Sequence, residues 1–99
     1  MSKYLVLYRS PVSAREQIAN ATPEQVQAGM DAWQTWAQTA GPALVDFGAP
    51  LAGDADITGY SILQADSGSA IEALLADHPH GHVPGATIDV LEFLAVPGM

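Results

Sequence analysis

The stretch that decides the fold is KYLVLYR, residues 3–9, near the start of the chain. It holds no Gly or Pro and is rich in Tyr, Leu and Val, a composition typical of a β-strand. Alternate side chains of a strand point to opposite faces of its sheet. Because both faces are apolar at the middle, both are predicted to be covered. The two faces would carry Tyr4, Val6 and Tyr8 on one side, and Lys3, Leu5, Leu7 and Arg9 on the other.

A long helix is predicted after this strand, from Pro23 to about Ala40. Thr22 has the chemistry of an N-cap, and Gln25 lies three residues later, as in a capping box. Gly41 follows the last helical residue and is suited to end the helix. The apolar stripe is expected to comprise Val26, Met30, Trp33, Ala37 and Ala40, with Trp36 beside it.

The remaining elements complete an alternating pattern. A turn of helix is expected near residues 14–19, strands at 43–48, 57–65 and 87–96, a hairpin turn at 51–56, a helix from the caps Asp66 and Ser67 to about Asp77, and a loop at 78–86. The order strand–helix–strand–strand–helix–strand is typical of the α+β ferredoxin-like fold. In that fold a four-stranded antiparallel sheet carries two helices on one face. Residues 1–99 are expected to form one domain.

The predicted sheet leaves its second face without a helix. That face is apolar, and a large exposed apolar surface usually marks an interaction site. Pairing with a second copy of the same chain is the commonest solution, because a two-fold axis makes one patch complementary to itself. The sequence therefore predicts a homodimer closed through the sheet face.

Composition excludes several classes of protein. Lys and Arg number 3 against 11 Asp and Glu, giving a net charge of −8, so nucleic acid and anionic membranes are not expected as partners. The absence of cysteine rules out disulfides, a thiolate nucleophile and a Cys-ligated zinc. No apolar run approaches the roughly 20 residues of a membrane span. The first residues lack the features of a signal peptide, so a cytoplasmic location is expected.

The three histidines of the chain alternate as His78, His80 and His82. If the segment is extended, their imidazoles project to one side and could hold zinc or another divalent metal, with Asp77 behind them. A second interpretation is that one of them contacts a ligand or transfers a proton. A third is a surface loop whose histidines bind nothing. The three alternatives stay open on the sequence alone.

Four short segments resemble the YCII-related proteins of the dimeric α/β-barrel superfamily. They are residues 3–8 (KYLVLY), 48–51 (GAPL), 59–62 (GYSI) and 77–79 (DHP). The resemblance implies a ferredoxin-like subunit, paired sheets and a ligand pocket beside the barrel of the dimer. It also implies acid–base chemistry, because the family pairs a histidine of the first helix with an aspartate that precedes a proline after the second helix.

The chain departs from the family at this pair of residues. Its first predicted helix has no histidine, and alignment on Gly48 and Pro79 places Asp31 near the family's histidine position. The same alignment places His78 at the family's aspartate position. The acid and the imidazole thus look exchanged, and His78 is predicted to be catalytic together with Asp31 or Asp77.

Other candidate residues surround this pair. Arg9 could bind a carboxylate or phosphate with its planar guanidinium, or could instead pair with one of the acidic residues. Trp36 is predicted to line the pocket, with Trp33 in the core. Tyr8 and His80 complete the predicted substrate-binding set.

Two functions remain open. The first is a cofactor-free enzyme that transfers protons on a small organic molecule with His78. The second is a dimeric small-molecule-binding or accessory protein without catalysis. No cofactor is expected for either, and metal binding by His78, His80 and His82 is kept only as an alternative.

Overall fold

A computed structural model describes residues 1–53 and 56–98 of the chain. The elements are β1 (Ser2–Arg9), α1 (Ala14–Asn20), α2 (Pro23–Ala40), η1 (Gly41–Ala43), β2 (Leu44–Asp46), β3 (Ile57–Ala65), α3 (Gly68–Leu75), η2 (Pro79–His82) and β4 (Thr87–Glu92). The elements η1 and η2 are short 3₁₀ turns. Among the described residues, no helix is long and apolar enough to cross a bilayer.

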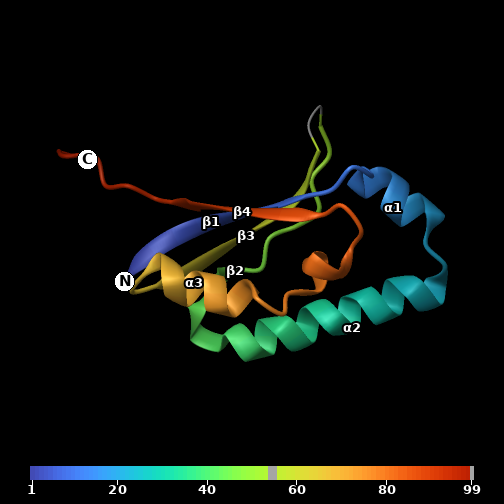
Figure 1. Cartoon of the computed structure of the whole chain (residues 1–99), viewed down its shortest axis with the longest axis horizontal. Helices are drawn as coiled ribbons and strands as arrows, with labels where there is room; N and C mark the ends of the chain where they lie inside the picture. Colours follow the sequence, from blue (N-terminus) through green and yellow to red (C-terminus); the bar gives the residue numbers. More distant parts are fainter. Residues whose placement is uncertain (54–55, 99) are drawn as a thin grey trace.

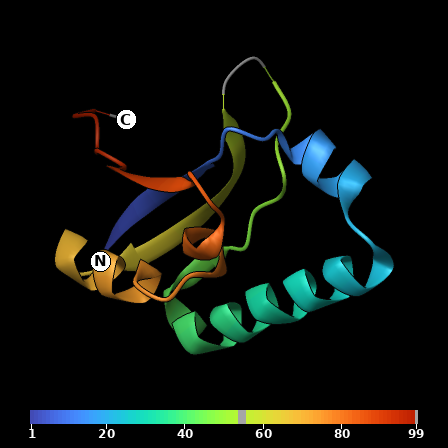
Figure 2. The ribbon, with the colours of Figure 1, turned by 45° about the vertical axis from the view of Figure 1, so that its right-hand side comes forward.

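The four strands form one antiparallel sheet in the order β2-β3-β1-β4. Strand β1 therefore lies inside the sheet, between β3 and β4. Helices α2 and α3 lie on the same side of the sheet, and η2 sits between the sheet and α2 (Figure 1). The view in Figure 2 shows the same two layers, with α1 beyond the end of the sheet. The predicted α+β ferredoxin-like fold is confirmed.

The core lies between the sheet and the helices. Val6 of β1 is fully buried opposite Ser61 of β3 and Val90 of β4, so the register places one row of side chains under the helices. The indole Nε1 of Trp36 donates a hydrogen bond to the carbonyl oxygen of Leu74, 2.8 Å away, which ties α2 to α3. The buried apolar residues of this core are Tyr4, Val6, Tyr8, Trp36, Ala40, Leu63, Ala65 and Ile71.

The opposite face of the sheet carries no helix or strand of the described chain (Figures 1 and 2). It is apolar at its middle and carries the Arg9–Asp89 ion pair at one end. Register places Leu5 opposite Ile62 and Leu91, and Leu7 opposite Tyr60. Leu91 is 51% exposed. We call these five residues (Leu5, Leu7, Tyr60, Ile62 and Leu91) the open face.

Local sequence chemistry explains where the helices begin. Thr22 Oγ1 accepts a hydrogen bond from the backbone N–H of Gln25, and Gln25 Oε1 accepts one from the backbone N–H of Thr22, so the predicted capping box is present. Ser67 caps α3 through the backbone N–H of Ala70. Both start signals are confirmed, and so is the short helix α1.

Several predicted boundaries are wrong. Strand β2 covers three residues rather than 43–48, because η1 takes its start and the Asp46 side chain accepts the backbone N–H of Gly48 beyond its end. Strand β4 ends at Glu92 rather than Val96, because its ladder with β1 stops at the pair of Glu92 with Tyr4 and only the backbone N–H of Phe93 makes one further bond, to the carbonyl oxygen of Lys3. Helix α3 ends at Leu75, before the predicted Asp77. The predicted hairpin turn at 51–56 includes residues 54 and 55, which lie outside the described residues.

Ile71 tests the importance of the core between α3 and the sheet. Its side chain is 0% exposed, whereas Ile18 of α1 is 62% exposed. Replacing Ile71 by Ala should lower the free energy of unfolding by roughly 3 kcal/mol, because it removes buried apolar surface and leaves a cavity. Ile18→Ala deletes the same atoms in water and should change it by less than about 0.5 kcal/mol. Urea denaturation of both variants measures the difference, and equal losses would contradict this core.

Candidate ligand-binding site

A cavity of about 410 Å³ lies where the end of the sheet meets α1, α2 and the segment after β2. Its volume falls in the range of small-molecule sites. The described residues that line it include no Lys, Arg, Asp or Glu. The polar side chains among the lining residues are Gln17, Thr58, His80 and the hydroxyl of Tyr8. The larger apolar and aromatic lining residues are Tyr8, Ile18, Met30, Trp33, Phe47 and Pro50.

Gly48 shapes one wall of the cavity. Its φ is +86°, a left-handed conformation that favours glycine. A Cβ at this position would collide with the carbonyl oxygen of Tyr60. The chain after β2 can therefore pass directly against β3, which brings the side chain of Phe47 to within 6.0 Å of Trp33, measured between ring centres.

Tyr8 brings a buried hydroxyl to the cavity. This hydroxyl donates to Ser61 Oγ at 2.9 Å, and Ser61 Oγ donates to the carbonyl oxygen of Phe47 at 2.7 Å. Burial raises the pKa of Tyr8 to about 12. The hydroxyl of Tyr8 is therefore neutral, and its hydrogen is donated to Ser61. Its oxygen can still accept a hydrogen bond.

His80 is the lining residue best suited to acid–base chemistry. Its Nε2 lies 2.8 Å from the carbonyl oxygen of Arg9. A carbonyl oxygen only accepts, so Nε2 carries the hydrogen and Nδ1 keeps its lone pair in the neutral ring. Within residues 1–53 and 56–98, Nδ1 has no hydrogen-bond partner, and it is not among the fully enclosed unpartnered atoms. His80, which lines the cavity, therefore keeps one unused acceptor, Nδ1.

His78 occupies a different environment, only two residues away. It is 1% exposed, and its ring centre lies 4.8 Å from Tyr8, 4.4 Å from Trp33 and 4.3 Å from Trp36. Its Nδ1 accepts the backbone N–H of His80 at 3.0 Å, so its hydrogen is on Nε2, which is buried and has no partner in the described part of the chain. Burial, with a smaller contribution from His80, lowers the pKa of His78 to about 4.

The predicted contact between Asp31 and His78 is not formed. Asp31 is exposed on α2 and accepts a hydrogen bond from Gln27 Nε2 at 2.8 Å. Asp77 is exposed as well. The contact is absent because Asp31 and Trp36 lie on different sides of α2. The side with Trp36 packs in the core, and the side with Asp31 faces solvent. The catalytic roles assigned to these residues stay predictions, and neither carboxylate lies against the imidazole of His78.

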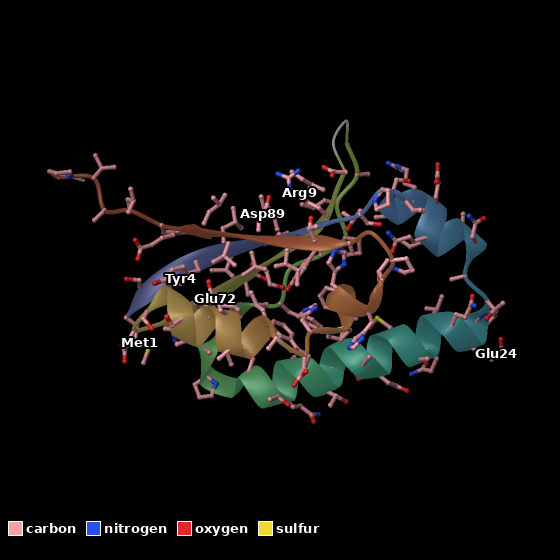
Figure 3. All side chains as sticks on the ribbon, viewed as in Figure 1. Met1, Tyr4, Arg9, Glu24, Glu72 and Asp89 are labelled. Carbon is pink, nitrogen blue, oxygen red and sulfur yellow. The ribbon has the colours of Figure 1, made fainter. Side chains whose placement is uncertain are left out.

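Arg9 follows one of its two predicted alternatives, whereas Trp36 differs from its predicted place. The guanidinium of Arg9 pairs with Asp89 and with Asp56, the latter at 2.8 Å. Figure 3 shows Arg9 and Asp89 on the side of the sheet away from α2. The ion-pair alternative for Arg9 is therefore the one observed. Trp36 is buried in the core and Trp33 lines the cavity, so the predicted places of the two indoles are reversed.

The three histidines do not form a metal-binding cluster. Pro79 to His82 fold into the 3₁₀ turn η2, so the segment is not extended and the condition for three imidazoles on one side is not met. His82 is exposed, whereas His78 and His80 are buried. In the described ranges, no group of three or more His, Asp or Glu side chains is placed to hold a metal ion.

Sequence reasoning found Tyr8 and His80 but missed other parts of the cavity. Phe47 lay inside a predicted strand, and Gln17, Met30 and Thr58 carried no signal of a site. Gly48 was the available clue, because a glycine between an apolar strand and a proline often marks a tight turn or a close backbone approach. The lining residues come from six separate segments, and only their packing reveals the cavity.

The buried imidazole of His78 predicts an acid-sensitive step in stability. Its native pKa of about 4 lies below the ordinary value of 6.5, so the unfolded chain binds a proton on His78 between these values and the native chain does not. The stability contributed by this residue is complete above pH 6.5 and is lost as the pH falls, by up to roughly 3 kcal/mol.

Urea denaturation between pH 7 and pH 4 measures this effect against His78→Gln, which cannot titrate. The wild type should lose more stability on acidification than the variant does. His82→Gln, at an exposed histidine of the same turn, should keep the wild-type slope. Parallel curves for the wild type and His78→Gln would show that the native environment leaves the pKa of His78 unchanged.

Comparison with known proteins extends the fold assignment. No family model matches the chain. No curated protein matches it either. Among solved structures, the chain is similar to 5-chloro-2-hydroxyhydroquinone dehydrochlorinase from Burkholderia phenoliruptrix AC1100, solved in complex with 2,5-dihydroxybenzoquinone. The two sequences are 17% identical, and the TM-score is 0.52. The match covers 88% of this chain and 90% of that chain. At this identity the likeness shows a shared fold, and membership of the YCII-related family stays a prediction.

Proposed function

We propose that the protein binds a small, uncharged, hydroxylated ring compound in the cavity and transfers a proton with His80. The observation that carries this proposal is that His80 lines an aromatic cavity and has an unpartnered Nδ1 in the described part of the chain, with the tautomer set by the carbonyl oxygen of Arg9. Proton transfer by an imidazole needs no cofactor.

The lining chemistry selects the charge of the ligand. A bound carboxylate or phosphate would meet no cationic side chain among the described lining residues, and a bound amine would meet no carboxylate. Burying an unpaired charge is costly. The net charge of −8 also repels anions at a distance. An uncharged molecule avoids both penalties.

The shape of the lining selects the framework of the ligand. Tyr8 and Trp33 pack edge to face with ring centres 5.0 Å apart, and Phe47 lies beyond Trp33. Aromatic walls of this kind favour a flat ring through stacked and edge contacts. The solved structure of similar fold holds 2,5-dihydroxybenzoquinone, a flat hydroxylated ring. That likeness supports the flat, hydroxylated framework of the ligand.

His80 would act on the hydroxyl of such a ring. The hydroxyl O–H bond breaks, an N–H bond forms at Nδ1, and the electron pair stays on the oxygen, where it is shared with the ring. The charged imidazole keeps its Nε2–H bond to the carbonyl oxygen of Arg9, which stabilises the positive charge. A proton returned to a ring carbon completes the transfer and regenerates neutral His80.

A non-catalytic binding protein is the second candidate. It is favoured by one observation: among the described residues, His80 has a backbone carbonyl as its partner and no carboxylate. A carboxylate would stabilise the imidazolium more strongly. Binding and catalysis therefore need separate measurements.

Binding is tested with hydroquinone, 1,4-dimethoxybenzene and 4-hydroxybenzoate by titration calorimetry. Hydroquinone should bind best, because it is uncharged and donates to His80. His80→Gln should weaken its binding about tenfold, as expected for loss of one buried hydrogen bond. His82→Gln is the matched control and should bind as the wild type does. Tightest binding of 4-hydroxybenzoate, or equal binding by His80→Gln, would refute the proposed site.

Catalysis is tested by deuterium uptake at the ring carbons of 1,3-dihydroxybenzene in D₂O, followed by proton NMR. The wild type should accelerate the exchange, because removal of the hydroxyl proton places negative charge on those carbons. His80→Gln should abolish the acceleration. Binding without acceleration would identify the second candidate, a binding protein, as correct.

We also propose that the open face closes a homodimer. Leu5, Leu7 and Ile62 lie on adjacent strands at the middle of the sheet, with Leu91 beside them. An apolar sheet face in water is unfavourable by about 25 cal/mol for each Å² that a partner could cover. A second copy offers the same shape and chemistry across a two-fold axis.

Sedimentation equilibrium tests the dimer, which should have twice the 10.3 kDa of one chain. Leu7→Lys places a charge at the middle of the open face and should shift the mass toward one chain. Val26→Lys introduces the same charge on the exposed surface of α2 and should leave the mass unchanged. A folded wild-type protein with the mass of one chain at high micromolar concentration would rule the dimer out.

A further inference from the structure

We infer that His78 is a positioning residue for His80, because its Nδ1 holds the backbone N–H of His80 and so fixes the imidazole that faces the cavity. The inference rests on the proposed function, in which His80 is the working group. It assigns His78 a role other than the proton transfer expected from the sequence.

The turn η2 explains why His78 carries this bond. The turn begins at Pro79, which has no N–H, so His80 supplies the first N–H of the turn. His78 precedes the turn in an extended conformation, and its Nδ1 accepts that N–H at 3.0 Å. It therefore acts as an N-cap, a role usually filled by Ser, Thr, Asp or Asn.

The ring of His78 is held more firmly than an ordinary capping side chain. Trp33 and Trp36 pack against it edge-on, and Tyr8 stacks on it with an interplanar angle of 25°. Two of these residues, Tyr8 and Trp33, also line the cavity. The wall of the cavity and the cap of the turn are thus one packed unit.

His80 is consequently anchored at two points. Its backbone N–H is held by His78, and its Nε2 is held by the carbonyl oxygen of Arg9 at 2.8 Å. One bond therefore holds the backbone of His80, and the other holds its imidazole ring. The orientation of the unpartnered Nδ1 is then fixed, and a fixed orientation of the reacting group favours proton transfer.

A role as filler alone does not explain an imidazole at this position. His78 Nε2 is buried without a partner in the described residues, which an apolar side chain of similar size would avoid. The choice of histidine is explained if the acceptor on Nδ1 is needed. The neutral ring supplies that acceptor together with a flat surface for the three aromatic neighbours.

Two substitutions separate positioning from filling. His78→Leu fills the space without an acceptor, whereas His78→Asn keeps an acceptor suited to an N-cap. We expect His78→Leu to accelerate solvent exchange of the His80 Nε2 proton, measured by NMR, and to weaken hydroquinone binding, each by about tenfold. His78→Asn should stay within about threefold of the wild type on both measures.

The control is His82→Leu, which changes an exposed histidine of the same turn and should alter neither quantity. If His78→Leu does not fold, His78→Gln replaces it, because a glutamine side chain is a poorer N-cap than asparagine. Lower melting temperatures in the variants with unchanged Nε2 exchange and unchanged binding would show that His78 only fills space.

The Nε2 exchange measurement needs no ligand, so the two proposals fail separately. Faster exchange in His78→Leu, with no hydroquinone binding by any variant, would support the positioning role and refute the proposed function. Hydroquinone binding that depends on His80 but not on His78 would support the proposed function and refute the positioning role.

Discussion

Strand β1 imposes the main constraint on this molecule, because both of its faces are apolar at the middle. One face packs Val6 beneath α2 and α3, where it is fully buried. The other presents Leu5 and Leu7 with no element of the described chain over them. A chain of 99 residues has enough helix to cover one face of its sheet but not both. The second apolar face is the reason to expect a partner.

The covered face also produces the candidate site. Tyr8 stands at the end of the buried row of β1, where the long helix α2 has diverged from the sheet and α1 closes the gap. The space is filled by aromatic rings and by His78, and what remains open becomes the cavity. Core and site are therefore continuous, so changes in the aromatic cluster should affect both stability and ligand binding.

Much of the fold could be predicted from local sequence, while the site could not. The capping box at Thr22 and the alternation in β1 are signals carried by neighbouring residues, and both were confirmed. The site depends on contacts between distant segments, such as His80 with Arg9, which are separated by 71 positions. The places of Trp33 and Trp36 could not be predicted for the same reason. The two indoles lie one helical turn apart on α2, and only the packing of α2 against the sheet determines that Trp36 is in the core and Trp33 lines the cavity.

His78 and His80 show how environment divides work between two identical side chains. Aromatic rings enclose His78, lower its pKa to about 4 and so keep it a neutral hydrogen-bond acceptor across the physiological range. His80 keeps one nitrogen on a backbone carbonyl and the other free. A neutral, immobile imidazole is suited to holding a turn, and an imidazole with an accessible lone pair is suited to exchanging a proton. The proline between them lacks an N–H, which makes the N–H of His80 the first that His78 can cap, and so the two roles are linked through the backbone of a single turn.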